Sequence, residues 1–120
     1  MLVKNFFLVL LIASFIFVGC GHDPVEKIDC SGITPTYSAD IAPILNATCA
    51  DDGCHGNVNT QAGIKLTNYA EAKAGSGNSK FLKAIKYQSG ATAMPPDPAF
   101  KLSDAQVKLI ECWIQNGKPE

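Results

Sequence analysis

The chain has 120 residues, 47% of them hydrophobic, and its 10 Lys and Arg against 11 Asp and Glu give a formal net charge of −1. All ten of these basic residues are lysines. Basic and acidic residues are nearly equal in number, so the composition gives no sign of the basic face that nucleic-acid binding requires. Once the apolar N-terminal segment is set aside, the remaining length suits one small domain.

The first nineteen residues predict a signal peptide. Lys4 precedes the apolar run "FFLVLLIASFIFV" at residues 6–18, which is shorter than the roughly 20 residues that a membrane-spanning helix needs. The ending "FVGC" resembles the lipobox of bacterial lipoproteins, which implies cleavage after Gly19 and lipidation of Cys20. The alternative is an uncleaved apolar anchor with an incidental cysteine. In both cases we expect the rest of the chain to lie outside the cytoplasm, where disulfides persist.

Residues 20–35 are predicted to be the lipidated cysteine followed by a flexible tether, because the stretch is polar and contains Gly and Pro. His22 is interpreted as a solvated residue of this tether. A helical domain is expected over residues 36–120. Its first helix, within "YSADIAPILNATCA", is predicted to have Ser38 as N-cap and Pro43 in the first turn.

Two shorter helices are predicted next. "TNYAEAKAG" at residues 67–75 is expected to be capped by Thr67 or Asn68 and to end at Gly75. "SKFLKAIKY" at residues 79–87 has apolar residues on one face. Its lysines are Lys80, Lys83 and Lys86, which we interpret as a solvated row, with docking to an acidic partner as the alternative.

The C-terminal part combines a stiff loop with the clearest helix of the chain. "GATAMPPDPAFK" has three prolines within four residues, which excludes a helix or strand interior. In the last segment Ser103 and Gln106 form a capping box, and Gly117 with Pro119 ends the helix. No segment alternates with period two, so the domain is predicted to be all-α.

The stretch "CADDGCHG" carries the strongest chemical signal. C-x-x-C-H is the attachment signature of c-type heme: two thiols form thioethers, and the following histidine is the proximal iron ligand. Here Cys49, Cys54 and His55 have the spacing C-x₄-C-H, so two extra residues must loop out, with Gly53 at positive φ. A Cys49–Cys54 disulfide would suit the same turn. Structural zinc lacks a second pair of close ligands, and a catalytic thiol suits an oxidising compartment poorly.

Met94 is the only methionine outside the signal segment, and it lies in "MPP" on the stiff loop. A thioether is the usual distal ligand opposite histidine in cytochromes c. The alternative interpretation is a loop methionine that packs on the core.

The segments "YSADIAPILNATCADDGCHG", "GIKLTNYAEA" and "AMPPDPAFKLSDAQVKLIECWIQNGK" resemble, over residues 37–118, the small class I cytochrome c domains of Bacteroidetes-type envelope lipoproteins. This resemblance implies helices wrapped around one heme c, with thioethers at Cys49 and Cys54 and axial ligands His55 and Met94. It also implies that the terminal helix, with Trp113, crosses the first helix. The C-x₄-C spacing departs from the common motif.

With these roles assigned, Cys30 and Cys112 remain, and we expect a disulfide between them. The alternative is that both are unpaired and that Cys112 is a small buried hydrophobe.

The expected function is one-electron transfer by a carrier that is not an enzyme and has no small-molecule substrate. Its expected partners are redox proteins and, through the lipid on Cys20, a membrane of the cell envelope, with the domain facing the periplasm or the cell surface. Two alternatives stay open. One is a heme protein that binds or senses a small ligand after Met94 leaves the iron. The other is a disulfide-stapled binding lipoprotein without heme.

Overall fold

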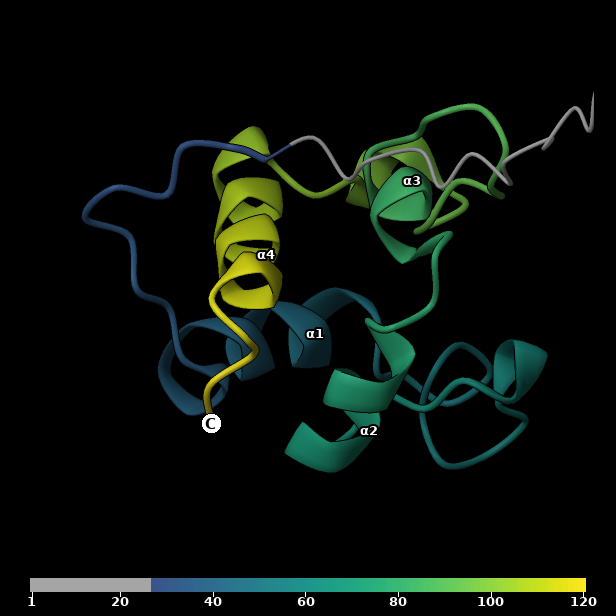
Figure 1. The fold of residues 1–120 in the computed structure, drawn as a ribbon. Coiled ribbons are helices and arrows are strands. Elements are labelled where there is room, and N and C mark those ends of the chain that lie inside the picture. Colours follow the sequence, from purple (N-terminus) through teal and green to yellow (C-terminus); the bar gives the residue numbers. More distant parts are fainter. Residues whose placement is uncertain (1–26) are drawn as a thin grey trace, which may run out of the picture.

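Short helices joined by long loops form the part of the chain that the structure, a computed structural model, describes, which is residues 27–120 (Figure 1). The predicted signal peptide, Cys20 and His22 lie outside these residues. Four α-helices, one π-helical segment and two 3-10 turns occur in the described residues, and no strand does. In chain order the elements are η1 Tyr37–Ile41, α1 Ala42–Thr48, η2 Gln61–Gly63, α2 Tyr69–Gly75, α3 Phe81–Ile85, η3 Pro98–Phe100 and α4 Asp104–Gln115.

The first helix begins with the π-helical segment η1, which continues directly into α1. Thr36 is its N-cap and accepts a hydrogen bond from the Ala39 N–H at 3.3 Å, so the prediction of Ser38 as the cap is wrong. The Asp40 carboxylate accepts a reciprocal bond from the Thr36 N–H at 2.9 Å, and this pairing favours Thr36 over Ser38. Pro43 lies in the first turn of α1, as predicted. The wider π-turn ahead of it fits a residue that has no N–H and crowds the preceding turn.

The two middle helices follow their sequence signals closely. Asn68 caps α2 by accepting from the Glu71 N–H at 3.0 Å, and α2 ends at Gly75, as predicted. α3 is shorter than predicted, since it spans only Phe81–Ile85. The proline-rich loop forms no α-helix or strand but includes the 3-10 turn η3, which begins at Pro98 because a first position needs no N–H donor.

The predicted start and end of α4 are confirmed, since the helix spans Asp104–Gln115. Ser103 and Gln106 form both halves of the capping box, and Gly117 has a φ of +89° directly beyond the C-cap residue Asn116. Figure 1 shows α4 crossing the segment of η1 and α1, with α2 and α3 to one side.

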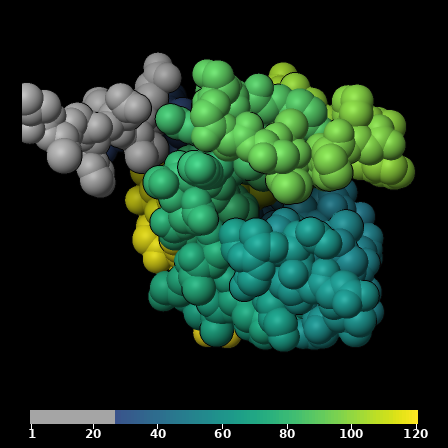
Figure 2. Space-filling view, turned by 90° about the vertical axis from the view of Figure 1, so that its right-hand side faces the viewer, coloured from purple at the N-terminus to yellow at the C-terminus, as the bar shows by residue number. Residues whose placement is uncertain are grey.

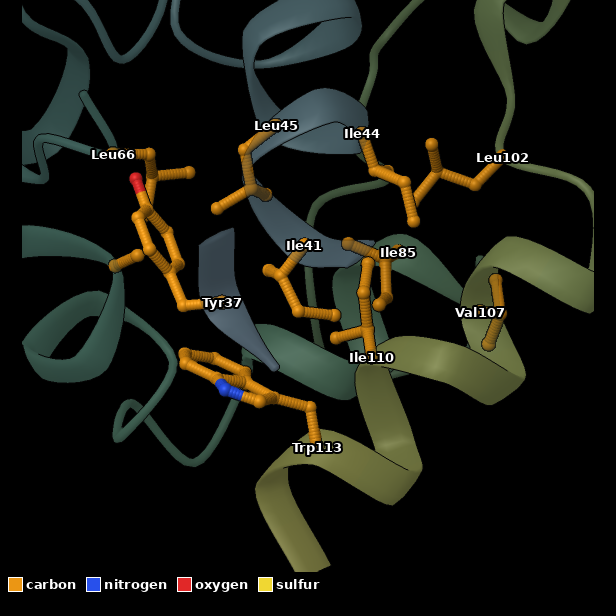
Figure 3. Packing of buried hydrophobic residues seen from close by; sticks show 11 residues of the cluster. Tyr37, Ile41, Ile44, Leu45, Leu66, Ile85, Leu102, Val107, Ile110 and Trp113 are labelled. Atoms are coloured by element: carbon orange, nitrogen blue, oxygen red, sulfur yellow. The ribbon is translucent and has the colours of Figure 1, made fainter. Parts of the chain in front are cut away.

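The core lies where α4 crosses η1 and α1 (Figure 3). Ile41 and Ile110 are completely buried, and Trp113 packs on Tyr37 with ring centroids 6.2 Å apart. The largest fully buried side chains are Trp113, Ile41, Leu45, Ile110 and Cys112. Burying side chains of this size contributes roughly 1.5–3 kcal/mol each relative to leaving them exposed, so this crossing is the main apolar support of the domain.

The C-terminal carbonyls join three elements. The Pro119 oxygen accepts from the Tyr37 N–H at 2.9 Å and from the Trp113 indole N–H at 2.8 Å. The Lys118 oxygen accepts from the Tyr69 hydroxyl at 2.9 Å. These bonds hold the start of η1 and of α2 against the end of α4.

The described part of the predicted tether is fixed to α4. A disulfide joins Cys30 to Cys112, with a Cα–Cα distance of 5.6 Å, as the sequence predicts. The side-chain amides of Gln115 and Asn116 donate to the carbonyls of Ile28 and Ile33, both at 3.1 Å. Residues 28–33 are therefore held by the domain, unlike the flexible tether expected there. No helix within residues 27–120 has the length and apolar character needed to cross a membrane.

Candidate functional site

Two loop regions form the walls of a cleft on one face of the molecule. Figure 2 shows the teal atoms of the loop between α1 and α2 below a hollow, and the green atoms of α3 and the following loop above it. The yellow of the C-terminal segment is visible between the two. The sequence predicted its candidate site residues in these two loops.

The lower loop brings Cys49, Cys54 and His55 into one closed turn. The His55 N–H donates to the Cys49 carbonyl at 3.0 Å, which shuts the loop across the two extra residues of the motif. Gly53 has a φ of +82°, as predicted. Its N–H donates to the Val58 carbonyl at 2.8 Å. The longer spacing is thus accommodated by an ordered, hydrogen-bonded turn.

Gly56, directly after the histidine, is a structural requirement of this turn that sequence reasoning missed. A Cβ at this residue would lie 2.7 Å from the Ala50 carbonyl oxygen and 2.7 Å from the Asp51 carbonyl carbon. The Gly56 N–H also donates to the Asp51 carbonyl at 2.9 Å. Only glycine fits this approach of two backbone segments without movement. The signal was present in the sequence as the "G" that follows "CH".

The His55 ring is held in one orientation. Its Nδ1 atom lies 2.8 Å from the Ile64 carbonyl oxygen. A carbonyl can only accept a hydrogen bond, so Nδ1 carries a proton, and in the neutral ring Nε2 then keeps its lone pair. The Leu66 N–H donates to the His55 carbonyl at 2.9 Å, which fixes the backbone of the same residue. This arrangement is typical of a metal-ligating histidine, whose second ring nitrogen is bound to an acceptor.

Both cysteines of the motif are free thiols, so the alternative Cys49–Cys54 disulfide is not formed in the structure. Cys54 is exposed, whereas Cys49 is half-buried and packs against the core. Burial raises the pKa of the Cys49 thiol; a hydrogen bond with Thr48, whose hydroxyl oxygen lies 3.4 Å from the sulfur, opposes this shift, and the negative forms of Cys54 and Asp51 add to it. Cys49 therefore stays a protonated thiol at neutral pH.

Met94 lies in the loop that follows α3, and its backbone is hydrogen-bonded to that helix. The residue is half-buried. Its N–H donates to the carbonyl of Ala84, near the end of α3, at 3.1 Å. The next carbonyl, that of Pro95, accepts a hydrogen bond from the Tyr87 hydroxyl. The structure thus places the predicted ligands in separate loops, with His55 and the cysteines in one and Met94 in the other.

The predicted lysine row is only partly a solvated face. Lys86 forms an ion pair with Glu111 of α4 at 2.7 Å, and its side chain is 30% exposed. This correction has a physical reason: the end of α3 faces α4, so the lysine there meets a carboxylate instead of water. A pocket of about 230 Å³ adjoins the pair.

A larger hollow of about 560 Å³ lies along α2 and the segment before it. Its lining includes Ile64, Lys65 and Glu71 but neither His55 nor Met94. The hydrogen bonds from Thr67 hold the pKa of the Glu71 carboxyl below its usual range. Within residues 27–120, no three His, Cys, Asp or Glu side chains are grouped so that they could hold a metal ion.

The two loops on either side of the hollow contain one histidine and two cysteines in the lower loop and one methionine in the upper loop. Comparison of the chain with protein-family models, with curated proteins and with solved structures finds no match.

Proposed function

We propose that this protein is a one-electron carrier with a covalently bound c-type heme whose iron is ligated by His55 and Met94. The observation that carries the proposal is the 2.8 Å contact between His55 Nδ1 and the Ile64 carbonyl. It selects the neutral tautomer in which Nε2 has a lone pair available for a metal ion, and it restrains the orientation of the ring. Because the histidine follows directly on a cysteine, the thioether bond and the iron ligand would come from adjacent residues.

The thiol chemistry of the lower loop fits such a group. Cys49 and Cys54 form no disulfide. The backbone hydrogen bond from His55 to Cys49 keeps the first cysteine close to the histidine despite the longer spacing. The two sulfurs would form the two thioethers. The Cys30–Cys112 disulfide agrees with an oxidising compartment outside the cytoplasm, where c-type heme proteins with structural disulfides are stable.

Apolar side chains of the lower loop and of α3 suit a large hydrophobic ring. Ile64 belongs to the lower loop, and Phe81 and Leu82 belong to α3. All three are half-buried and pack against the core. Pockets for cofactors combine such apolar lining with a few placed polar groups, which here are the histidine and the methionine.

A heme in this cleft would supply reversible one-electron chemistry at its iron. If His55 and Met94 both bound the iron, they would leave no position open for a substrate, which is why we propose a carrier and not an enzyme. A lipid on Cys20 would hold the carrier at a membrane of the cell envelope, and its partners would be redox proteins.

The decisive experiment expresses the full chain together with a heme-attachment system. We expect a Soret band that survives denaturation and extraction with acid acetone, and a reduced pyridine spectrum typical of two saturated vinyls. Cys49→Ala and Cys54→Ala should each leave one vinyl unsaturated, and the two variants are matched controls for each other. Protein without a Soret band would favour a disulfide-stapled binding protein. Ready binding of CO by the ferrous protein would favour a ligand-binding or sensing heme protein.

The axial ligand is tested separately. Met94→Ala should abolish the weak sulfur-to-iron band at the red end of the ferric spectrum and lower the reduction potential, because the axial ligand is a main determinant of that potential. Met94→Leu keeps the apolar bulk without the sulfur, so it separates loss of ligation from loss of packing. An unchanged spectrum and potential in both variants would assign the sixth position to another residue, such as Lys86 or Lys101.

A further inference from the structure

Tyr87, the second residue after α3, has a backbone conformation that favours glycine. Its φ is +58°, in the left-handed region. The Tyr87 N–H donates to the Ala84 carbonyl at 3.1 Å, and the Gln88 N–H donates to the Lys83 carbonyl at 2.8 Å. These are the two bonds of a Schellman helix end, in which the left-handed residue is usually glycine. The helix end alone therefore gives no reason for a tyrosine, whose side chain makes the conformation less favourable.

The side chain supplies a reason. The Tyr87 hydroxyl donates to the carbonyl of Pro95, directly after Met94. The Met94 N–H donates to the Ala84 carbonyl, which also accepts the hydrogen bond from the Tyr87 N–H. The Met94–Pro95 segment is thus bound on both sides to the end of α3. The ammonium of Lys101 lies 5.1 Å from the centroid of the Tyr87 ring, a cation–π contact that restrains the ring.

We infer that Tyr87 is a positioning residue for Met94. Its hydroxyl holds the Met94–Pro95 segment against α3, so that the methionine sulfur is kept at its place in the cleft and external ligands compete with it less well. This inference rests on the proposed function, because it assumes that Met94 is an iron ligand. Tyr87 acts through Met94, and its left-handed backbone directs the ring toward the loop.

The consequence is measurable as a competition. An external ligand such as imidazole must displace Met94, so its apparent affinity reports how well the methionine is held. Tyr87→Phe removes one hydrogen bond and nothing else from the ring. Loss of a single such bond corresponds to a roughly three- to tenfold change in an equilibrium. We therefore expect imidazole to bind the ferric form of Tyr87→Phe roughly three- to tenfold more tightly than it binds the unsubstituted protein.

The experiment titrates imidazole into the full, heme-loaded chain and follows the shift of the Soret band, which is present in every variant, together with the loss of the sulfur-to-iron band where Met94 is retained. Tyr69→Phe is the matched control, because the Tyr69 hydroxyl also donates to a backbone carbonyl, that of Lys118 at 2.9 Å. It should leave the imidazole affinity unchanged. In a Met94→Ala background, Tyr87→Phe should change the affinity no further, since the group through which it acts is gone.

Tyr87→Gly provides a second variant that is expected to fold. Glycine suits the left-handed position, so this protein should still fold, and it should bind imidazole more tightly than the unsubstituted protein. Wild-type imidazole affinity in both Tyr87 variants would overturn the inference, as would an effect of Tyr87→Phe that persists without Met94. If these results came from a protein with covalent heme and Met94 ligation, the proposed function would stand. Absence of covalent heme, or of Met94 ligation, would remove both.

Discussion

The crossing of α4 over η1 and α1 and the two loops around the cleft are stabilised in different ways. All of the largest fully buried side chains belong to the crossing. The loops instead expose Val58 by 55% and Phe100 by 63%, one in each loop. All four candidate heme-binding residues lie in the loops. Apolar burial therefore stabilises the scaffold, whereas the candidate heme-binding residues lie on loops that the scaffold positions.

The loops are nevertheless ordered by polar contacts. One carboxylate oxygen of Asp52 accepts from the N–H groups of Asn57 and Val58 at 3.1 and 3.0 Å, and the His55 ring is bound to a carbonyl in the same way. Substitutions in the crossing should therefore change the free energy of unfolding while leaving the heme spectrum unchanged. Substitutions in the loops should instead change heme incorporation or the heme spectrum, whether or not they also change the free energy of unfolding.

Removing the disulfide is expected to lower the free energy of unfolding strongly. Cys30→Ala combined with Cys112→Ala frees a loop with a sequence separation of 82 residues. On the chain-entropy model such a closure is worth at most about 4.5 kcal/mol in free energy of unfolding. Urea unfolding of the double variant beside the unsubstituted protein measures the loss. An unchanged urea midpoint, or two titratable thiols at these positions in the oxidised unsubstituted protein, would contradict the bond.

Ile110 tests the scaffold without touching a cysteine. Its side chain is completely buried in the crossing, so Ile110→Ala should lower the free energy of unfolding by roughly 2–5 kcal/mol. Ile110→Val is the graded control, with an expected loss of roughly 0.5–1.5 kcal/mol. The Soret and sulfur-to-iron bands of the folded protein should not move. A spectral change in Ile110→Val would show that scaffold and cleft are coupled.

Alanine substitutions at two glycines of the lower loop distinguish a steric effect from an effect of backbone conformation. Gly56→Ala places a Cβ 2.7 Å from backbone atoms and should cost roughly 1–3 kcal/mol while reducing covalent heme incorporation. Gly53→Ala meets nothing within 4 Å but forces a side chain onto a φ of +82°, at a cost of roughly 1–2 kcal/mol. Heme yield and urea midpoint are compared for both. Equal heme yields would contradict the steric role of Gly56.

The smallest effect concerns Glu71, at the start of α2. Its carboxylate accepts from the Thr67 hydroxyl at 2.6 Å and from the Thr67 N–H at 3.0 Å, and these bonds lower its pKa from the usual 4.5. A lowered pKa in the folded state stabilises the protein above the pH at which the unfolded carboxyl titrates, and this contribution is lost as the pH falls. Glu71→Gln should therefore flatten the fall of the urea midpoint below about pH 5. An identical fall in both proteins would contradict this.

Local sequence signals predicted most of the scaffold. The capping box at Ser103 and Gln106, the C-terminal Gly117 and the cap at Asn68 each depend on neighbours within four residues, so their patterns can be read directly from the sequence. The prediction failed at Ser38 because the reciprocal partner of Thr36 is Asp40, and the π-turn between them alters the usual spacing.

The sequence predicted which residues belong to the candidate site, but it did not predict the contacts that hold them in place. Cys49, Cys54, His55 and Met94 follow from a motif and a unique methionine. The carbonyl of Ile64 and the hydroxyl of Tyr87 have no local pattern, because each contact joins residues eight or nine positions apart through an irregular loop. The left-handed conformation of Tyr87 was equally hidden, since a sequence predicts such a conformation only where glycine or asparagine stands.

The bond between Cys30 and Cys112 also defines how the molecule bears mechanical force. A pull applied between the two ends of the chain would travel from Cys30 across the sulfur atoms into the last turn of α4. The helices and both loops around the cleft lie between these two cysteines in the chain, apart from the final residues of α4. Tension on the N-terminal segment would thus bypass them, and the cleft would keep its shape under a load that could extend only the segments outside the covalent loop.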